Sequence, residues 1–438
     1  MKLRRALNTA ALVFVMFFNV SGGPFTTETL IVRAGPGLGL LILLLVPLLW
    51  SLPETLIIGE LASMLPEEGG YYKWVQRAFG KFWAFQNGWW TWMYSLVDMA
   101  IYPVLFNAYL AFFAPSLSAW ATWTISLAVI WGATAINLRG AARVGTSSII
   151  SGAFILGVFA LLSLAAIPHI HHVPWKPFVT PGQTTLGGIG VGVSIALWNY
   201  IGWDNPSTVE GEVVNASRSY PRALAITLPL VVAGYLIPLL ASAGASDWTQ
   251  WREGGWPEIA RMSAGTLGAP LAILIAVAGM VSALALFNAL LMSYSRIPLV
   301  MAQDGFLPPG LARTDTRGTP RNAILFSAIF YSVFALVPFA RLVVADVLLY
   351  AMALFLEFGA LIMLRRREPE LRGDFRIPAG VATVAALAAL PLLILVGVVI
   401  LEMRDGEFGL PAVLGALAMA ALGPIVYYFS SGRPGSST

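Results

Sequence analysis

Cysteine is absent from the 438 residues of this chain, and charged residues are scarce. The absence of cysteine excludes disulfides, thiolate chemistry and cysteine-ligated metal sites. Only 11% of the residues are charged whereas 58% are hydrophobic, so the chain cannot present the surface of an ordinary soluble protein. The composition therefore predicts a protein that crosses a membrane many times.

About twelve segments reach the roughly 20 apolar residues that a helix needs to span a bilayer. We expect an all-α integral membrane protein with about 12 transmembrane helices, since no linker separates a soluble domain. Residues 71 to 80 predict an amphipathic helix that anchors at the interface. The predicted spans lie near 6–34, 37–65, 82–114, 117–138, 144–168, 186–212, 222–245, 266–295, 320–340, 343–365, 378–401 and 409–430.

The positions of the basic residues predict the orientation. Lys2, Arg4 and Arg5 precede the first span, and the even-numbered connections carry most of the other Lys and Arg residues. By the positive-inside rule, both termini are cytoplasmic and the protein is multi-pass in the plasma (inner) membrane. The net charge of +4 reflects this topology, so we expect lipid around the protein and no nucleic-acid partner.

Two of the predicted spans are interrupted by residues that do not favour a continuous helix. Ser21, Gly22, Gly23 and Pro24 break the first, and the segment from Trp198 to Pro206 breaks the sixth. A single proline commonly makes only a kink, but adjacent glycines free the backbone so that its amides can approach a ligand. Two broken helices in corresponding halves indicate the substrate site of a secondary transporter. The candidate substrate-binding residues are Ser21, Gly22, Gly23, Asp98, Trp198, Asn199, Trp203 and Asp204.

The spacing of these breaks also predicts an inverted repeat. Five spans precede residue 168, five more follow up to residue 365, and each set opens with a broken helix. An odd number of helices per repeat inverts the second copy, which gives a 5+5 fold with discontinuous helices 1 and 6. The expected units are residues 1–168, residues 169–365, and two additional C-terminal helices in 366–438.

Carboxylates within apolar spans supply the chemical argument. A bare carboxylate in a bilayer costs a few kcal/mol, so it must be protonated, hydrated or paired with a cation that enters from outside. Asp98 and Asp204 are the first choices, whereas Glu60 could simply cap backbone, and Asp346 and Arg365 mark polar ends of the helix that carries Glu357. The spans that carry these acids indicate no Lys or Arg as a fixed partner for them. The candidate proton-coupling residues are Asp98, Asp204, Glu54, Glu60 and Glu357.

Other functions have weaker support in the sequence. Sodium coupling is an alternative, because Ser282, Asn288 and Ser293 could supply hard oxygen ligands. His169, His171 and His172 lie without a nearby acid in an outer connection, so we expect no bound metal and no other cofactor. No nucleophile lies beside a base, which argues against an enzyme. A channel and a solute sensor that does not transport remain open.

Several motifs resemble the amino acid/polyamine/organocation superfamily, and within it the branch of polyamine uptake transporters. The similarity extends over nearly all of the first ten spans, and the order and spacing of the motifs make it specific. The motifs are Ser21 to Phe25, Trp50 to Glu54, Gly59 to Ala62, Pro66 to Tyr71, Asp98 with Tyr102 to Leu105, Trp203 to Val213, and Ser295-Arg296 with Asp304-Gly305.

The resemblance implies proton-coupled symport of a small amine-bearing solute, either a polyamine or an amino acid, by alternating access. It places the substrate near helices 1, 3, 6, 8 and 10. Two departures affect the mechanism. Ser-Gly-Gly-Pro replaces the Gly-Ser-Gly of many amino acid transporters, and the fifth span lacks the lysine that some proton-coupled members carry. We therefore look for the proton carrier among the carboxylates, with sodium coupling or exchange as alternatives; the oligomeric state is not predicted.

Overall fold

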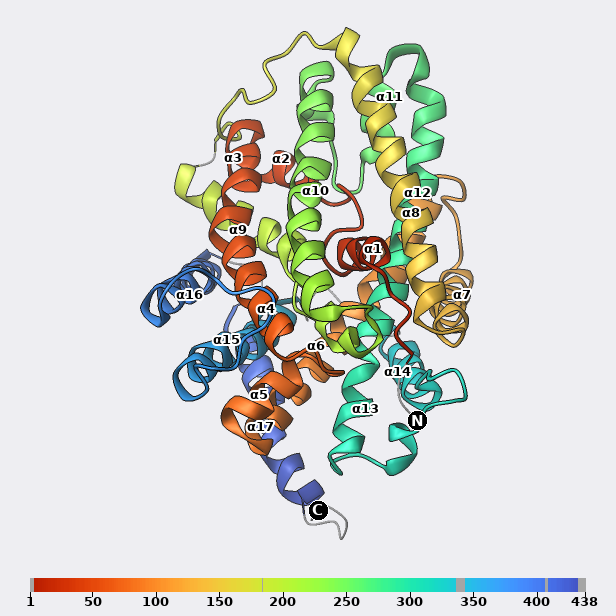
Figure 1. The fold of residues 1–438 in the computed structure, drawn as a ribbon. Coiled ribbons are helices and arrows are strands. Elements are labelled where there is room, and N and C mark those ends of the chain that lie inside the picture. Colours follow the sequence, from red (N-terminus) through yellow and green to blue (C-terminus); the bar gives the residue numbers. More distant parts are fainter. Residues whose placement is uncertain (1–3, 183, 336–342, 406–408, 432–438) are drawn as a thin grey trace.

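The computed structural model describes residues 4–182, 184–335, 343–405 and 409–431, which are helical and contain no β-strand. Each predicted span contains at least one helix (Figure 1). The helices are α1 (Thr9–Val20), α2 (Glu28–Ala34), α3 (Pro36–Val46), the π-helical η1 (Pro47–Ser51), α4 (Leu52–Met64), α5 (Tyr71–Phe79), α6 (Lys81–Leu110), α7 (Ala119–Asn137), α8 (Ala141–Ala166), α9 (Thr185–Tyr200), the 3-10 helix η3 (Asn205–Glu212), α10 (Ala216–Ala245), α11 (Trp256–Ser263), α12 (Gly268–Tyr294), α13 (Arg296–Gln303), α14 (Arg321–Phe334), α15 (Val343–Arg367), α16 (Val381–Asp405) and α17 (Gly409–Ser431), with short 3-10 turns at Ile167–His169, Trp248–Gln250, Gly265–Leu267 and Pro309–Ala312.

Length and composition support the prediction of a helical membrane protein. Within the described residues, eight helical stretches are long and apolar enough to cross a bilayer. The helix α1 is shorter because the first break divides its span, and α6 is less apolar because it carries Asp98, Asn87 and Gln86. The number of twelve spans, the inverted repeat and the three predicted units stay predictions.

Both predicted interruptions are present. The first helix ends at Val20 and the chain resumes as α2 at Glu28, while α9 ends at Tyr200 and η3 begins at Asn205. Positive φ angles occur inside both breaks, at Gly22 (66°), Gly23 (109°) and Gly202 (101°). Glycine populates this region without the steric cost that a Cβ atom brings. The glycines thus explain why the helices stop at these points.

Neighbouring helices provide partners for the backbone that the breaks release. The carbonyl of Gly22 accepts a hydrogen bond from Ser282 Oγ at 2.6 Å, and that of Asn199 accepts one from Tyr235 Oη at 2.8 Å. Such pairing is required because lipid offers no hydrogen bonds. Figure 1 shows α1 near the middle of the molecule, where it packs against α8, α10 and α12.

The helix α5 forms as the amphipathic pattern predicts, but its apolar face does not anchor in lipid. Tyr71, Tyr72, Trp74 and Val75 are each 0% exposed. They are covered by the protein itself, since α5 packs against α6 and α15. The expectation of an interfacial anchor is therefore wrong for the aromatic face of this helix.

Candidate functional site

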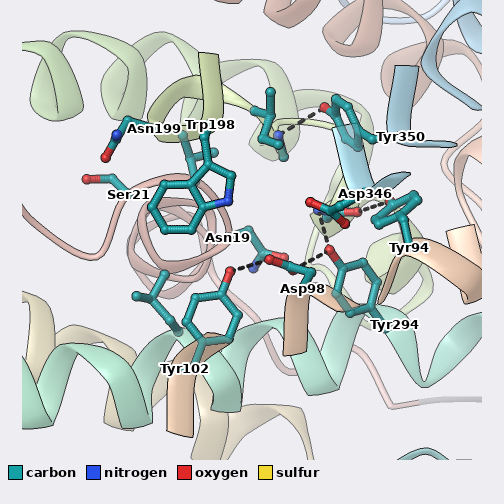
Figure 2. Close-up of a pocket in the computed structure, with 15 residues that line it drawn as sticks. Asn19, Ser21, Tyr94, Asp98, Tyr102, Trp198, Asn199, Tyr294, Asp346 and Tyr350 are labelled. Atoms are coloured by element: carbon teal, nitrogen blue, oxygen red, sulfur yellow. Dashed lines mark hydrogen bonds between the residues drawn. The ribbon is translucent and has the colours of Figure 1, made fainter. Parts of the chain in front are cut away.

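A narrow cavity lies where the two helix breaks meet α6, α12 and α15 (Figure 2). It measures about 40 Å³, which is room for a few water molecules. These helices are the first, third, sixth, eighth and tenth predicted spans, where the family resemblance expects substrate. The lining residues are Asn19, Val20, Ser21, Tyr94, Asp98, Tyr102, Trp198, Asn199, Ile201, Gly202, Asn205, Leu286, Tyr294, Asp346 and Tyr350.

Asp98 occupies one wall of the cavity. Its Oδ1 accepts a hydrogen bond from Tyr102 Oη at 2.8 Å, and its Oδ2 accepts one from Tyr294 Oη at 2.9 Å. Two hydroxyl donors suit an ionised carboxylate, which has only acceptor positions. The side chain is 8% exposed and points toward the cavity (Figure 2). An acid with two hydroxyl partners thus lies at the cavity wall without a basic side chain beside it.

Asp346, from the N-terminal part of α15, is a lining residue that the sequence analysis did not select. It is 2% exposed, and its Oδ1 accepts no hydrogen bond from any described residue. Figure 2 shows it on the same side of the cavity as Tyr94 and Tyr294, close to Asp98. The cavity lining includes no Lys, Arg or His among the described residues. The cavity therefore combines two acids with no cation from the protein.

A second group of acids lies behind Tyr350, which also lines the cavity. Tyr350 Oη is 2.8 Å from Glu54 Oε1 and 2.9 Å from Asp204 Oδ1. Glu357 lies deeper, where Asn87 Nδ2 donates to its Oε1 at 3.3 Å. Asp204 thus does not line the cavity itself but connects to it through Tyr350.

The remaining predicted substrate residues divide into two groups. Ser21, Trp198 and Asn199 line the cavity, whereas Gly22, Gly23 and Trp203 do not. The amide of Gly22 donates to the Phe17 carbonyl, and that of Gly23 donates to Ser21 Oγ at 3.1 Å. The expectation of free amides at the first break is therefore wrong in this conformation.

Glu60 has a permanent partner, contrary to the expectation from its own span. Arg365 donates two hydrogen bonds to it, from Nε to Oε1 at 2.6 Å and from Nη2 to Oε2 at 2.5 Å. The two side chains are 1% and 2% exposed. Arg365 comes from the end of α15, 305 residues away in the chain, so the residues around Glu60 do not indicate the pair. A carboxylate held in this way is poorly suited to take up and release a proton.

The residues proposed for sodium do not converge on one point. Ser282 Oγ donates to the Gly22 carbonyl, Asn288 Nδ2 donates to Ser147 Oγ, and Ser293 Oγ donates to Asn19 Oδ1. Each of the three side chains therefore donates a hydrogen bond to a different segment of the chain. This arrangement matches helix packing better than a shared set of ion ligands.

Gly202 gives a first testable consequence of the second break. A Cβ atom at this residue would lie 2.4 Å from the backbone oxygen of Asn19, and φ is 101°. We expect Gly202→Ala to destabilise the protein by roughly 1–3 kcal/mol, because a backbone contact cannot rotate away. Thermal unfolding in detergent measures the effect. Gly157→Ala in α8 is the control, since its Cβ would meet nothing within 4 Å; equal losses of melting temperature would contradict the prediction.

Comparison with known proteins gives the family. The amino acid permease model matches residues 7–422. Polyamine transporter PUT1 of Oryza sativa subsp. japonica is 35% identical over 428 residues, which is 95% of this chain and 77% of that protein. Polyamine transporter RMV1 of Arabidopsis thaliana is 35% identical over 90% of this chain and 80% of its own length. The uncharacterized transporter lpg1691 of Legionella pneumophila is 26% identical, over 86% of this chain and 85% of its own.

These relatives are named as transporters and not as enzymes, in agreement with the sequence prediction. The motifs from Ser21 to Gly305 all lie within the residues that the family model matches. The protein is thus a helical membrane transporter that belongs to the amino acid permease family, as the sequence resemblance indicated.

Proposed function

We propose that the protein is a secondary transporter for a small amine-bearing solute, driven by protons, with a linear polyamine as the preferred solute class. The observation that carries this proposal is the pair Asp98 and Asp346 in one cavity without a basic lining residue. Buried negative charge is costly unless a cation compensates it. Two ammonium groups on one solute would supply that compensation.

The other lining residues suit the same solute. Tyr94, Tyr102, Trp198, Tyr294 and Tyr350 place aromatic rings around the two acids. Aromatic faces attract ammonium groups, and a methylene chain packs well on them. An amino acid would in addition need donors for its carboxylate, and the amides of Gly22 and Gly23 are already in use. The site therefore favours a polyamine over an amino acid.

The relatives and the acid groups support the same proposal. PUT1 and RMV1 are named polyamine transporters. Protons are favoured over sodium because buried carboxylates surround the cavity, while the candidate sodium ligands have separate partners. The cavity holds only a few waters, so a solute must enter through a wider conformation. That requirement matches alternating access rather than an open channel.

Uptake into proteoliposomes tests the proposal. With an inside-alkaline pH gradient, we expect the purified protein to accumulate 1,4-diaminobutane above equilibrium, and a protonophore to abolish the accumulation. A sodium gradient alone should have no effect. Amino acids should compete weakly with the diamine. Binding without flux would instead indicate a sensor, uptake that requires internal amine would indicate an exchanger, and passive flux a channel.

Asp346 gives a sharper prediction about the solute. We expect Asp346→Asn to weaken 1,4-diaminobutane binding by about 10- to 100-fold, because one charge-assisted hydrogen bond of 1.5–3 kcal/mol is lost. Binding of 1-aminobutane, which has a single ammonium group, should change little. Thermal shifts of the purified variant with the two ligands measure the difference. Equal weakening for both amines would show that Asp346 does not hold the second ammonium group.

A further inference from the structure

One phenol oxygen in the structure has more neighbours than its single proton can satisfy. Tyr350 Oη lies 2.8 Å from Glu54 Oε1 and 2.9 Å from Asp204 Oδ1, and Gly202 donates its backbone N–H to the same oxygen at 2.9 Å. A phenol has one proton to donate and two positions at which it accepts. The amide of Gly202 takes one accepting position, so the phenol can donate to one carboxylate only.

The second carboxyl group cannot then be an anion. A carboxylate oxygen and a phenol oxygen at 2.8–2.9 Å need a proton between them, since two acceptors at this distance repel each other. If one carboxyl group is protonated, it donates to the second accepting position of Tyr350, and every position is used once. Both carboxyl oxygens contact the phenol oxygen directly, and the three side chains are 0–2% exposed, so no bridging water fits between them to supply the missing proton.

The surroundings decide which acid carries the proton. Asp204 is the N-cap of η3, where the partial positive charge of a helix start stabilises an anion. Glu54 lies inside the continuous stretch that η1 and α4 form. The ionisable side chains that face the group from other elements are Glu357, Tyr71, Tyr94 and Tyr220. Among the described residues, no Lys or Arg forms an ion pair with Glu54, Asp204 or Glu357.

We infer that Glu54, Tyr350 and Asp204 share one proton, that Glu54 carries it in this conformation, and that it is the proton coupled to amine transport. The coupling part rests on the proposed function. The three residues come from three elements: α4, α15 and the break between α9 and η3. Tyr350 also lines the cavity, so a movement of this break separates Asp204 from the bridge when the solute site opens. Tyr350 can then donate its own proton to Glu54, which stabilises the Glu54 carboxylate, so the proton on Glu54 can leave to water in the opened cavity.

Infrared difference spectra of the purified protein test the shared proton without any transport. The spectrum of the protein minus that of Glu54→Gln should contain the C=O band of a protonated acid and no carboxylate bands. The same difference for Asp204→Asn should contain carboxylate bands. Carboxylate bands in both differences would overturn the shared proton, and an acid band for Asp204 would overturn its assignment to Glu54. Exposed Glu370→Gln is the control and should show carboxylate bands.

Transport by the same variant tests the coupling. Glutamine imitates a protonated Glu54 and can still donate to Tyr350, so Glu54→Gln should fold, bind 1,4-diaminobutane and exchange it across the membrane. It should not accumulate the diamine under a pH gradient. Protonophore-sensitive accumulation by Glu54→Gln would overturn the coupling role. Absence of accumulation by the unmodified protein would contradict the proposed function instead, while the infrared result would stand by itself.

Discussion

Asp98→Asn is expected to reduce amine uptake by roughly 100-fold or more, because removing one partner of a buried charge pair costs several kcal/mol. Asn has nearly the shape of Asp: its Oδ1 can still accept from one of the two hydroxyls, of Tyr102 and Tyr294, that hold the carboxylate at 2.8 and 2.9 Å, and its Nδ2 can donate to the oxygen of the other. The substitution therefore removes the charge and changes the packing little. Loss of uptake would then show that the ammonium group of the solute needs the negative charge of Asp98.

Initial uptake of 1,4-diaminobutane into proteoliposomes measures this effect, with thermal unfolding as the test of folding. Asp98→Glu keeps the charge and displaces it by one methylene, so we expect partial activity. Asp247→Asn is the control, since Asp247 is exposed in the connection between α10 and α11 and accepts a hydrogen bond from Thr249. Normal uptake by Asp98→Asn in a folded protein would exclude Asp98 from solute binding.

The sequence predicts those features that depend on local chemistry. Gly22, Gly23 and Gly202 stand in apolar runs where a helix is otherwise favoured, and the structure places positive φ angles at all three. Each predicted span likewise contains helix, because long apolar runs allow few alternatives. Asp98 could be selected because no other charge lies near it in the chain, and it lines the cavity.

The sequence does not predict contacts between distant segments. Glu60 has no basic neighbour in its own span, and its partner Arg365 follows 305 residues later. Asp346 lies near one end of an apolar run, where a polar residue is ordinary, and only packing turns it toward Asp98. Tyr350 is one of 13 tyrosines, and nothing in its local sequence marks it as the bridge between two acids. These residues need tertiary structure to be found.

A similar reason explains the error about α5. Its alternating pattern shows that one face is apolar, but it does not show what covers that face. Lipid or a packed helix such as α6 would each cover an apolar residue on this face, for example Trp74, which is 0% exposed. Amphipathic patterns in membrane proteins therefore predict burial more reliably than they predict its partner.

Glu60→Gln is expected to destabilise the protein by about 3–5 kcal/mol, because it leaves Arg365 buried without its counter-charge. The pair also fixes the chain after α15: Ile377 N donates to Glu60 Oε2 at 2.8 Å, and Arg365 Nη2 donates to the Ile377 carbonyl at 2.9 Å. Loss of the carboxylate thus loosens the segment between α15 and α16 together with the C-terminal end of α4. Thermal and denaturant unfolding of the purified variant measure the loss.

A double-mutant cycle separates the charge pair from packing. Glu60→Leu and Arg365→Met should each be strongly destabilising, whereas the double variant should be less destabilised than the sum, since neither charge is then left unpaired. The exposed pair of Arg77 and Glu368, with side chains 45% and 35% exposed, is the control. Its carboxylate pKa is lowered chiefly by hydrogen bonds from Arg77. Even so, Glu368→Gln should leave the melting temperature nearly unchanged, because water replaces the lost contact. Additive losses in the cycle would show that Glu60 and Arg365 act separately, and the pair would not hold α4 to α15.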